Sequence, residues 1–190
     1  DFLSEFGRLS KPAQAKVTQI AEQFRQLNAN ELRAHKGIHL ESYSGARDDR
    51  ARTIRIDTNH RGVVLDAGNN ELFILTFIGT HDDVDRWMLN NTFRVNQATG
   101  ALEIINTVEI DAVVAEAAEP APADLAIFHE RRDRDFTSLG LSAELIPVVR
   151  AFTTDDQVLG LAAILPEQQA DALIALTGDD SVDVIYQQVA

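Results

Sequence analysis

The sequence predicts an α+β domain followed by a small all-α module, and three observations support this fold class. A helical pattern near the N-terminus gives way to four β-like segments with short polar turns, an order typical of a helix packed on an antiparallel meander. After residue 124 the pattern returns to short helices. Charge divides similarly: residues 1–95 hold 13 Lys+Arg and 13 Asp+Glu, whereas residues 96–190 hold 4 and 17 and account for the net charge of −13.

The first predicted element is an amphipathic helix over residues 11–28. Ser10 is a suitable N-cap, and Pro12 falls in the first turn, where its missing N–H costs no hydrogen bond. Apolar residues then recur at helical spacing, at Val17, Ile20, Ala21, Phe24 and Leu27. A short helical turn is expected at Glu31–Ala34.

Four strands are expected near residues 39–43, 52–57, 61–66 and 71–78. The polar segments Thr58-Asn59-His60 and Gly68-Asn69-Asn70 are hairpin-type connections between the later strands. The last strand has no polar alternation, which predicts a central strand covered on both faces. A helix over Asp83–Asn90, with Trp87 packed on the sheet, is expected to close the domain.

The predicted domain boundaries follow composition. An α+β domain over residues 8–105 precedes a semi-rigid Ala/Glu/Pro linker over 106–124 and an acidic helical module over 125–190. Four helices are expected in the module, at Ser142–Phe152, Thr154–Ile164, Pro166–Leu176 and Ser181–Val189. Their predicted core is Leu141, Leu145, Val148, Val149, Leu159, Leu161, Ile164, Leu173, Leu176, Val182 and Ile185.

Several kinds of chemistry are excluded by what the sequence lacks. It has no cysteine, so it has no disulfide framework and no thiolate site. No apolar run reaches the roughly 20 residues of a membrane-spanning helix, and the N-terminus does not resemble a secretory signal, so we expect no membrane partner and a cytoplasmic location. No P-loop is present. His35 and His39 lack a third ligand, so no metal site is expected.

The candidate site lies on the hairpin of the second and third strands. Pairing Asp57 opposite Arg61 would place Arg55, Asp57 and Arg61 on one face, where two guanidinium groups could hold a phosphate with Asp57 between them. Arginines that could bind nucleic acid through this region are Arg47, Arg50, Arg52, Arg55 and Arg61.

A candidate proton carrier follows the last predicted strand. His81 could act as a general acid or base beside Arg55 and Arg61. The alternative interpretation is structural: the arginines form a cross-strand ion network with Asp57, and His81 caps a turn with Asp82 or Asp83. The acidic second half would repel phosphate backbones, or serve only as a solvated surface.

Several stretches carry a resemblance to a known family. They are Gly45-Ala46-Arg47-Asp48, Arg52-Thr53-Ile54-Arg55-Ile56-Asp57, Arg61-Gly62-Val63-Val64-Leu65, His81-Asp82-Asp83-Val84-Asp85-Arg86-Trp87 and the segment Phe93–Leu102. Together they resemble the RelE-like domain at the N-terminus of some bacterial UvrD/Rep-type DNA helicases, within the RelE/ParE/HigB toxin superfamily. Leu139–Arg150 and Leu165-Pro166-Glu167 are similar to the helical segment that precedes the helicase motor.

The resemblance implies a RelE-like fold with phosphate contacts at Arg55 and Arg61 and an acid/base role at His81. It implies an accessory nucleic-acid-binding or regulatory region, with the helicase motor as its partner in cis. ATP and Mg²⁺ would belong to that motor, and no cofactor is expected here. The alternatives are a RelE-type endoribonuclease and a protein-interaction module. The acidic tail is expected to cover the arginine face, much as an antitoxin covers a toxin.

Overall fold

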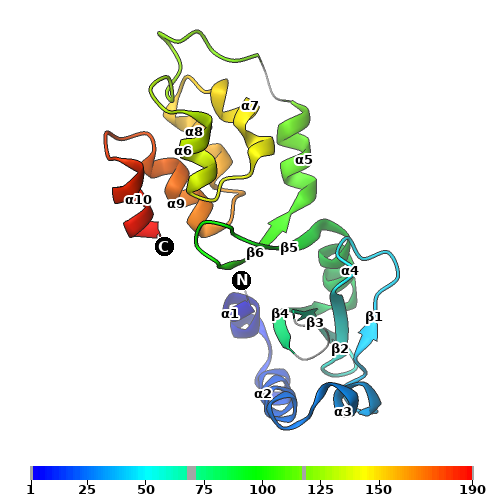
Figure 1. The fold of residues 1–190 in the computed structure, drawn as a ribbon. Helices are drawn as coiled ribbons and strands as arrows, with labels where there is room; N and C mark the ends of the chain where they lie inside the picture. The colour runs from blue at the N-terminus through cyan, green and yellow to red at the C-terminus, as the bar shows by residue number, and fades with distance from the viewer. Residues whose placement is uncertain (1, 68–71, 117–118, 190) are drawn as a thin grey trace. The chain divides into compact units, whose positions relative to one another are not determined.

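A computed structural model describes residues 2–67, 72–116 and 119–189 of the chain. The chain divides into two compact units, Asp1–Asn91 and Thr92–Ala190, shown as a ribbon in Figure 1. Each unit has its own hydrophobic core. The division falls before the predicted boundary at residue 105, because the strands β5 (Asn91–Val95) and β6 (Leu102–Asn106) pair with each other instead of joining the sheet of the first unit.

The first unit contains a four-stranded antiparallel sheet in the order β1-β2-β3-β4, so the predicted meander is confirmed. Its strands are β1 (Glu41–Ser42), β2 (Ala51–Arg55), β3 (His60–Asp66) and β4 (Phe73–Thr80). The apolar strand β4 is an edge strand, so its predicted central position is wrong. It is apolar because helices pack against it from two directions. The predicted turn Gly68-Asn69-Asn70 lies outside the described residues.

Helices cover both faces of this sheet (Figure 1). They are α1 (Phe2–Arg8), α2 (Lys11–Gln26), α3 (Ala29–Ala34) and α4 (His81–Asn90). One face carries Ile54 and Ile78, which share a buried cluster with Val17 and Ile20 of α2. Gly62 is the cross-strand partner of both Ile54 and Ile78, so the next residue, Val63, and its partner Phe77 lie on the other face. There the Phe77 ring stacks on the ring of Trp87 in α4, with 5.9 Å between the ring centroids.

The second unit consists of the β5–β6 hairpin and a set of short helices. The four predicted helices are present with shorter bounds, the first divided into a 3₁₀ turn and α7; two further helices, α5 and α6, were not predicted. In order they are α5 (Thr107–Ala115), α6 (Asp133–Ser138), η1 (Ala143–Leu145), α7 (Ile146–Arg150), α8 (Asp155–Ala162), α9 (Glu167–Ala175) and α10 (Val182–Val189). None of the described helices is long and apolar enough to cross a membrane.

Helix α5 occupies much of the segment predicted to be a linker. Ile110 is buried in the core of the second unit, and Val113 and Val114 pack against that core. These residues recur at i, i+3 and i+4, so the Ala-rich composition concealed a helix with one apolar face. Leu159 was also assigned wrongly: it is 54% exposed, because Val158 and Leu161 are the residues of α8 that face the core.

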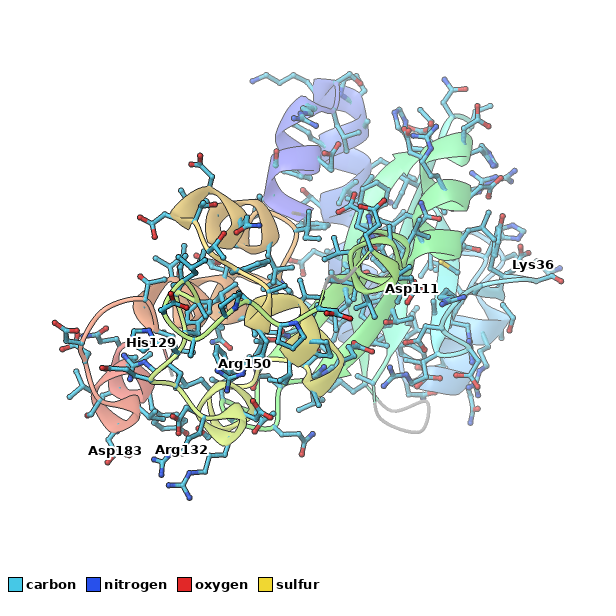
Figure 2. The ribbon with its side chains drawn as sticks, turned by 90° about the horizontal axis from the view of Figure 1, so that it is seen from above. Lys36, Asp111, His129, Arg132, Arg150 and Asp183 are labelled. Carbon is cyan, nitrogen blue, oxygen red and sulfur yellow. The ribbon has the colours of Figure 1, made fainter. Side chains whose placement is uncertain are left out.

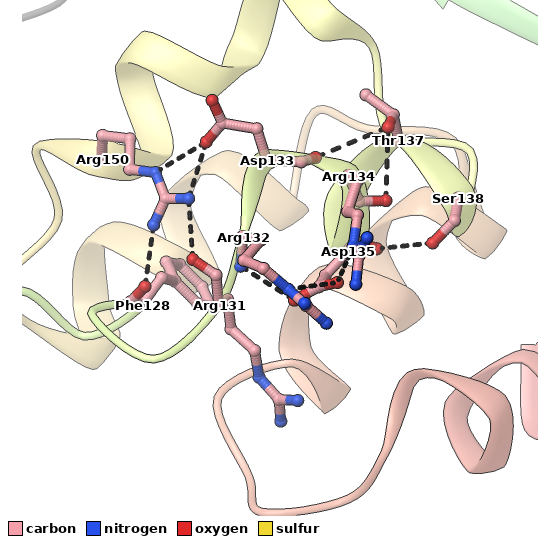
Figure 3. A network of polar contacts seen from close by, with 9 residues as sticks. All are labelled: Phe128, Arg131, Arg132, Asp133, Arg134, Asp135, Thr137, Ser138 and Arg150. Atoms are coloured by element: carbon pink, nitrogen blue, oxygen red, sulfur yellow. Dashed lines mark hydrogen bonds and ion pairs between the residues drawn. The ribbon is translucent and has the colours of Figure 1, made fainter.

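Arg150 connects the loop before α6 to α7 (Figure 3). Its guanidinium donates to Asp133 Oδ1 at 2.6 and 3.0 Å, and to the carbonyl oxygens of Phe128 and Arg131 at 2.8 and 2.7 Å. It also lies 5.3 Å from the ring centroid of Phe136. Arg150 therefore has a structural role in the second unit.

A buried polar cluster attaches the β5–β6 hairpin to α9. The carboxylate of Glu103 accepts hydrogen bonds from Asn96 Nδ2 and Gln169 Nε2, both at 2.7 Å. All three residues are buried. Gln169 Oε1 has no hydrogen-bond partner within the described part of the chain. The hairpin is thus held by polar contacts that the acidic composition did not reveal.

Candidate functional site

Arg55 and Arg61 are direct cross-strand partners on β2 and β3. The predicted register, with Asp57 opposite Arg61, is therefore wrong by two residues. The reason is the turn: the backbone N–H groups of Ile56 and Asp57 both donate to the His60 carbonyl, at 3.1 and 3.3 Å, so the strand pairing ends at Arg55. Because side chains alternate with a period of two, a two-residue shift keeps both arginines on one face.

Asp57 stabilises the turn and does not lie between the arginines. Its Oδ1 accepts hydrogen bonds from the backbone N–H groups of Asn59 and His60 at 2.8 and 2.9 Å. The carboxylate also contacts His60 Nδ1 at 3.0 Å. Partial burial raises the pKa of Asp57, but the hydrogen bonds from Asn59 and His60 outweigh burial, and the pKa lies below its ordinary value. Asp57 therefore remains ionised near neutral pH.

The arginine pair lines a small surface pocket of about 90 Å³. A water molecule occupies roughly 30 Å³ in the liquid, so the pocket has room for one small ionic group. The residues that line it come from the approach to β1, from β1 itself, and from β2 and β3. They are His39, Glu41, Thr53, Ile54, Arg55 and Arg61.

The two guanidinium groups differ in how firmly they are held. Arg61 Nη1 donates to the carbonyl oxygens of Asp57 and His60 at 3.0 and 3.1 Å, which fixes the side chain against the turn. Arg55 is exposed, and its guanidinium has no hydrogen bond or ion pair with any described residue. The pocket thus presents one positioned fork and one exposed fork that has no hydrogen bond or ion pair with the described residues, an arrangement suited to binding an anion.

His39 is a pocket residue that the sequence analysis considered only as half of a rejected metal site. Its Nδ1 lies 3.6 Å from Glu41 Oε1. Its φ of 49° is in the left-handed region, which residues other than glycine seldom adopt. The backbone N–H of Arg55 donates to the Ile38 carbonyl at 2.8 Å, so the chain at His39 runs beside Arg55. The pairing of β1 with β2, had it been assigned residue by residue, would have indicated this neighbour.

His81 does not line the pocket. It is the exposed first residue of α4, directly after the N-cap Thr80. The adjacent cap belongs to Asp83, whose Oδ2 accepts a hydrogen bond from Thr80 Oγ1 at 2.6 Å. Hydrogen bonds from Thr80 lower the pKa of Asp83. The cap is made by Thr80 and Asp83, so the expected capping role of His81 is wrong, and His81 does not line the pocket either.

The other predicted nucleic-acid-binding arginines do not line this pocket either. Arg50 makes two hydrogen bonds to the carboxylate of Asp48, at 2.9 and 2.7 Å, and these bonds raise its pKa. Arg52 is the partner of Val64 and so faces the opposite side of the sheet from Arg55. The backbone N–H of Arg47 donates to the Met88 carbonyl at 2.8 Å, which attaches the loop before β2 to α4.

A second group of arginines lies in the second unit, around α6. Arg131, Arg132 and Arg134 line a hollow of about 610 Å³ together with Glu130, Asp135 and Asp183, among others. Arg132 and Asp183 lie at the outer side of this unit, whereas Arg150 lies further in (Figure 2). Three carboxylates balance three guanidinium groups here, so the hollow does not select an anion by charge.

Among the described residues, no group of three or more His, Asp or Glu side chains is placed to hold a metal ion. Comparison with protein families found no match for this chain, and neither curated proteins nor solved structures included a similar one.

Proposed function

We propose that the chain is an accessory nucleic-acid-binding region of a UvrD/Rep-type ATP-dependent DNA helicase, and that its first unit contacts the phosphate backbone through Arg55 and Arg61. The observation that carries this proposal is the direct cross-strand pairing of these arginines in one small pocket. Arginine forks bind phosphate oxygens bidentately, and here two arginines on neighbouring strands line one pocket.

The proposal includes a RelE-like fold for the first unit. A helix packed on a four-stranded antiparallel sheet supports it, as do the sequence stretches that resemble the helicase-associated domain. The proposal also includes a helicase motor in the same protein, which supplies ATP hydrolysis and which this region would regulate. This chain has no P-loop, so its own contribution is contact with the nucleic acid.

Binding through one pocket has a measurable salt signature. Neutralising a single phosphate of a single strand gives a slope of log K against log salt of about −0.7. We expect weak binding of single-stranded DNA or RNA by the 190-residue chain, with a slope no steeper than this value between roughly 50 and 200 mM salt.

Three variants test the assignment by fluorescence anisotropy. Arg55→Ala and Arg61→Ala should each weaken binding several-fold and flatten the slope. The control is Arg25→Ala, because the Arg25 side chain on α2 is 77% exposed and lies outside the pocket. Equal losses in all three variants would show that binding depends only on net charge and would refute the proposed site.

A second candidate function is RNA cleavage of the RelE type, and His39 is the observation that favours it. Attack by a 2′-hydroxyl requires a proton acceptor beside groups that stabilise the charge of the transition state. The pocket places the His39 imidazole, with Glu41 beside it, on the same cavity as both arginines. If the chain cuts RNA in the presence of ribosomes, His39→Ala should abolish cutting and His81→Ala should not. Absence of cutting by the wild-type chain removes this candidate.

A further inference from the structure

We infer that the pocket selects the terminal phosphate of a nucleic-acid strand over the phosphodiesters within the strand. This inference rests on the proposed function and specifies its ligand. Three features lead to it: the size of the pocket, its charge, and the placement of the neighbouring Arg50 and Arg52 away from it.

The small size of the pocket favours a single phosphate group. Its volume is about 90 Å³, and its lining residues come from β1, β2 and β3 and from the residue His39 that leads into β1. A terminal phosphate carries a sugar on one side only, so the rest of the strand can leave through the pocket opening. An internal phosphodiester carries a sugar on each side and needs an open groove that admits both.

The charge of the pocket matches a dianion better than a monoanion. A phosphomonoester carries about −1.5 to −2 near pH 7 and has three terminal oxygens. An internal phosphodiester carries −1 and has two. Arg55 has all its guanidinium donors available, and Arg61 retains those not used by the turn carbonyls. The Glu41 carboxylate opposes any anion, but its side chain is 67% exposed and faces the His39 imidazole at 3.6 Å.

The surroundings of the pocket argue against tracking along a backbone. Proteins that follow a strand use a continuous positive groove with contacts to successive phosphates. Here Arg50 is paired with Asp48, and Arg52 lies on the opposite face of the sheet. Arg55 and Arg61 are the two arginines that line the pocket. One pocket for one phosphate is the arrangement expected for recognition of a strand end.

The test compares oligonucleotides of one sequence that carry either a 5′-phosphate or a 5′-hydroxyl. The 190-residue chain should bind the phosphorylated strand about tenfold more tightly, and inorganic phosphate should compete with it. Arg55→Ala should remove the difference. Arg55→Lys, which keeps the charge but loses the fork, should reduce it. Arg25→Ala should leave it unchanged.

The possible failures are distinguishable. Equal affinity for the two strands would overturn this inference and leave the proposed function standing. Absence of binding to either strand at low salt would overturn the proposed function itself. A phosphoserine peptide that binds as tightly as the phosphorylated strand would overturn the assignment of the pocket to nucleic-acid ends.

Discussion

Asp57 offers the sharpest link between local structure and the proposed site. Its carboxylate accepts two backbone N–H groups in the turn between β2 and β3 and contacts His60 Nδ1. Asp57→Ala removes all three contacts, and losses of this kind cost about 1–2 kcal/mol in the free energy of unfolding. Asp57→Asn retains an oxygen acceptor for the backbone groups and should cost only about 0.5 kcal/mol.

Urea unfolding followed by tryptophan fluorescence measures these costs in the first unit alone, because Trp87 is the only tryptophan. The pKa of Asp57 is lowered in the folded state, so its contribution to stability is complete above the unfolded value of about 3.9. The contribution disappears as pH falls through the folded pKa. The free energy of unfolding of Asp57→Ala should therefore depend less on pH in the acid range. The variant should also bind nucleic-acid strands more weakly. Equal costs for the alanine and asparagine variants, or no change in either, would refute the assigned turn role.

Three further sites, tested with four substitutions, probe the packing and the polar contacts, each by urea unfolding. Arg150→Ala should cost the second unit about 2–3 kcal/mol because two backbone carbonyl oxygens lose their donor, whereas Asp133→Ala, at a 69% exposed side chain, should cost about 0.5 kcal/mol. Gly62→Ala should destabilise the first unit by about 1–3 kcal/mol, since its Cβ would lie 3.0 Å from Cγ1 of the fully buried Ile54 as well as 2.8 Å from Leu75 Cδ1. Glu103→Ala should cost about 2–4 kcal/mol by leaving two buried amide donors unpaired. Far-UV circular dichroism reports the helices of both units and tryptophan fluorescence identifies the transition of the first unit, so the two signals together give the transition of the second unit. An unchanged transition would contradict each prediction.

The sequence predicted the elements whose signals are local. The helix from Lys11 carries its apolar stripe and its N-terminal proline within one segment, so its start was predicted correctly. The short helix α3 has a capping box between Asn28 and Glu31, and it too was expected. By contrast, α1, α5 and α6 have no more than nine residues each and depend on tertiary packing. Helices α1 and α6 are too short to show a clear period, and the apolar stripe of α5 was obscured by the Ala-rich composition around it.

The candidate site was predictable only where its signals were local. Both arginines were placed on one face because alternation along strands survives an error of two residues in register. The neighbour His39 was missed, since its place beside Arg55 depends on non-local pairing and on a left-handed backbone. His81 was favoured because it follows a strand, but its position at the start of α4 keeps it out of the pocket lining.

The charge asymmetry of the chain leads to a prediction about how its two units act on a bound strand. The first unit contains 12 basic and 13 acidic residues, and the second contains 5 and 17. Salt weakens the attraction at the arginine pair, but it also screens the repulsion from the acidic unit, whose field extends about 8–10 Å at moderate salt. The full chain should therefore show a shallower salt slope than the pocket alone would give.

Removing residues 92–190 should strengthen low-salt binding several-fold and steepen the slope toward about −0.7. The cut belongs after Asn91, because a cut at residue 105 would retain the β5–β6 hairpin without α9, to which Glu103 is bonded. The same measurement tests whether the acidic unit covers the arginine face. If it does, the gain in affinity on truncation should persist at high salt. If the acidic unit only repels the strand through solvent, high salt should abolish the gain in affinity. Identical binding before and after truncation would mean that the acidic half acts only as a solvated surface.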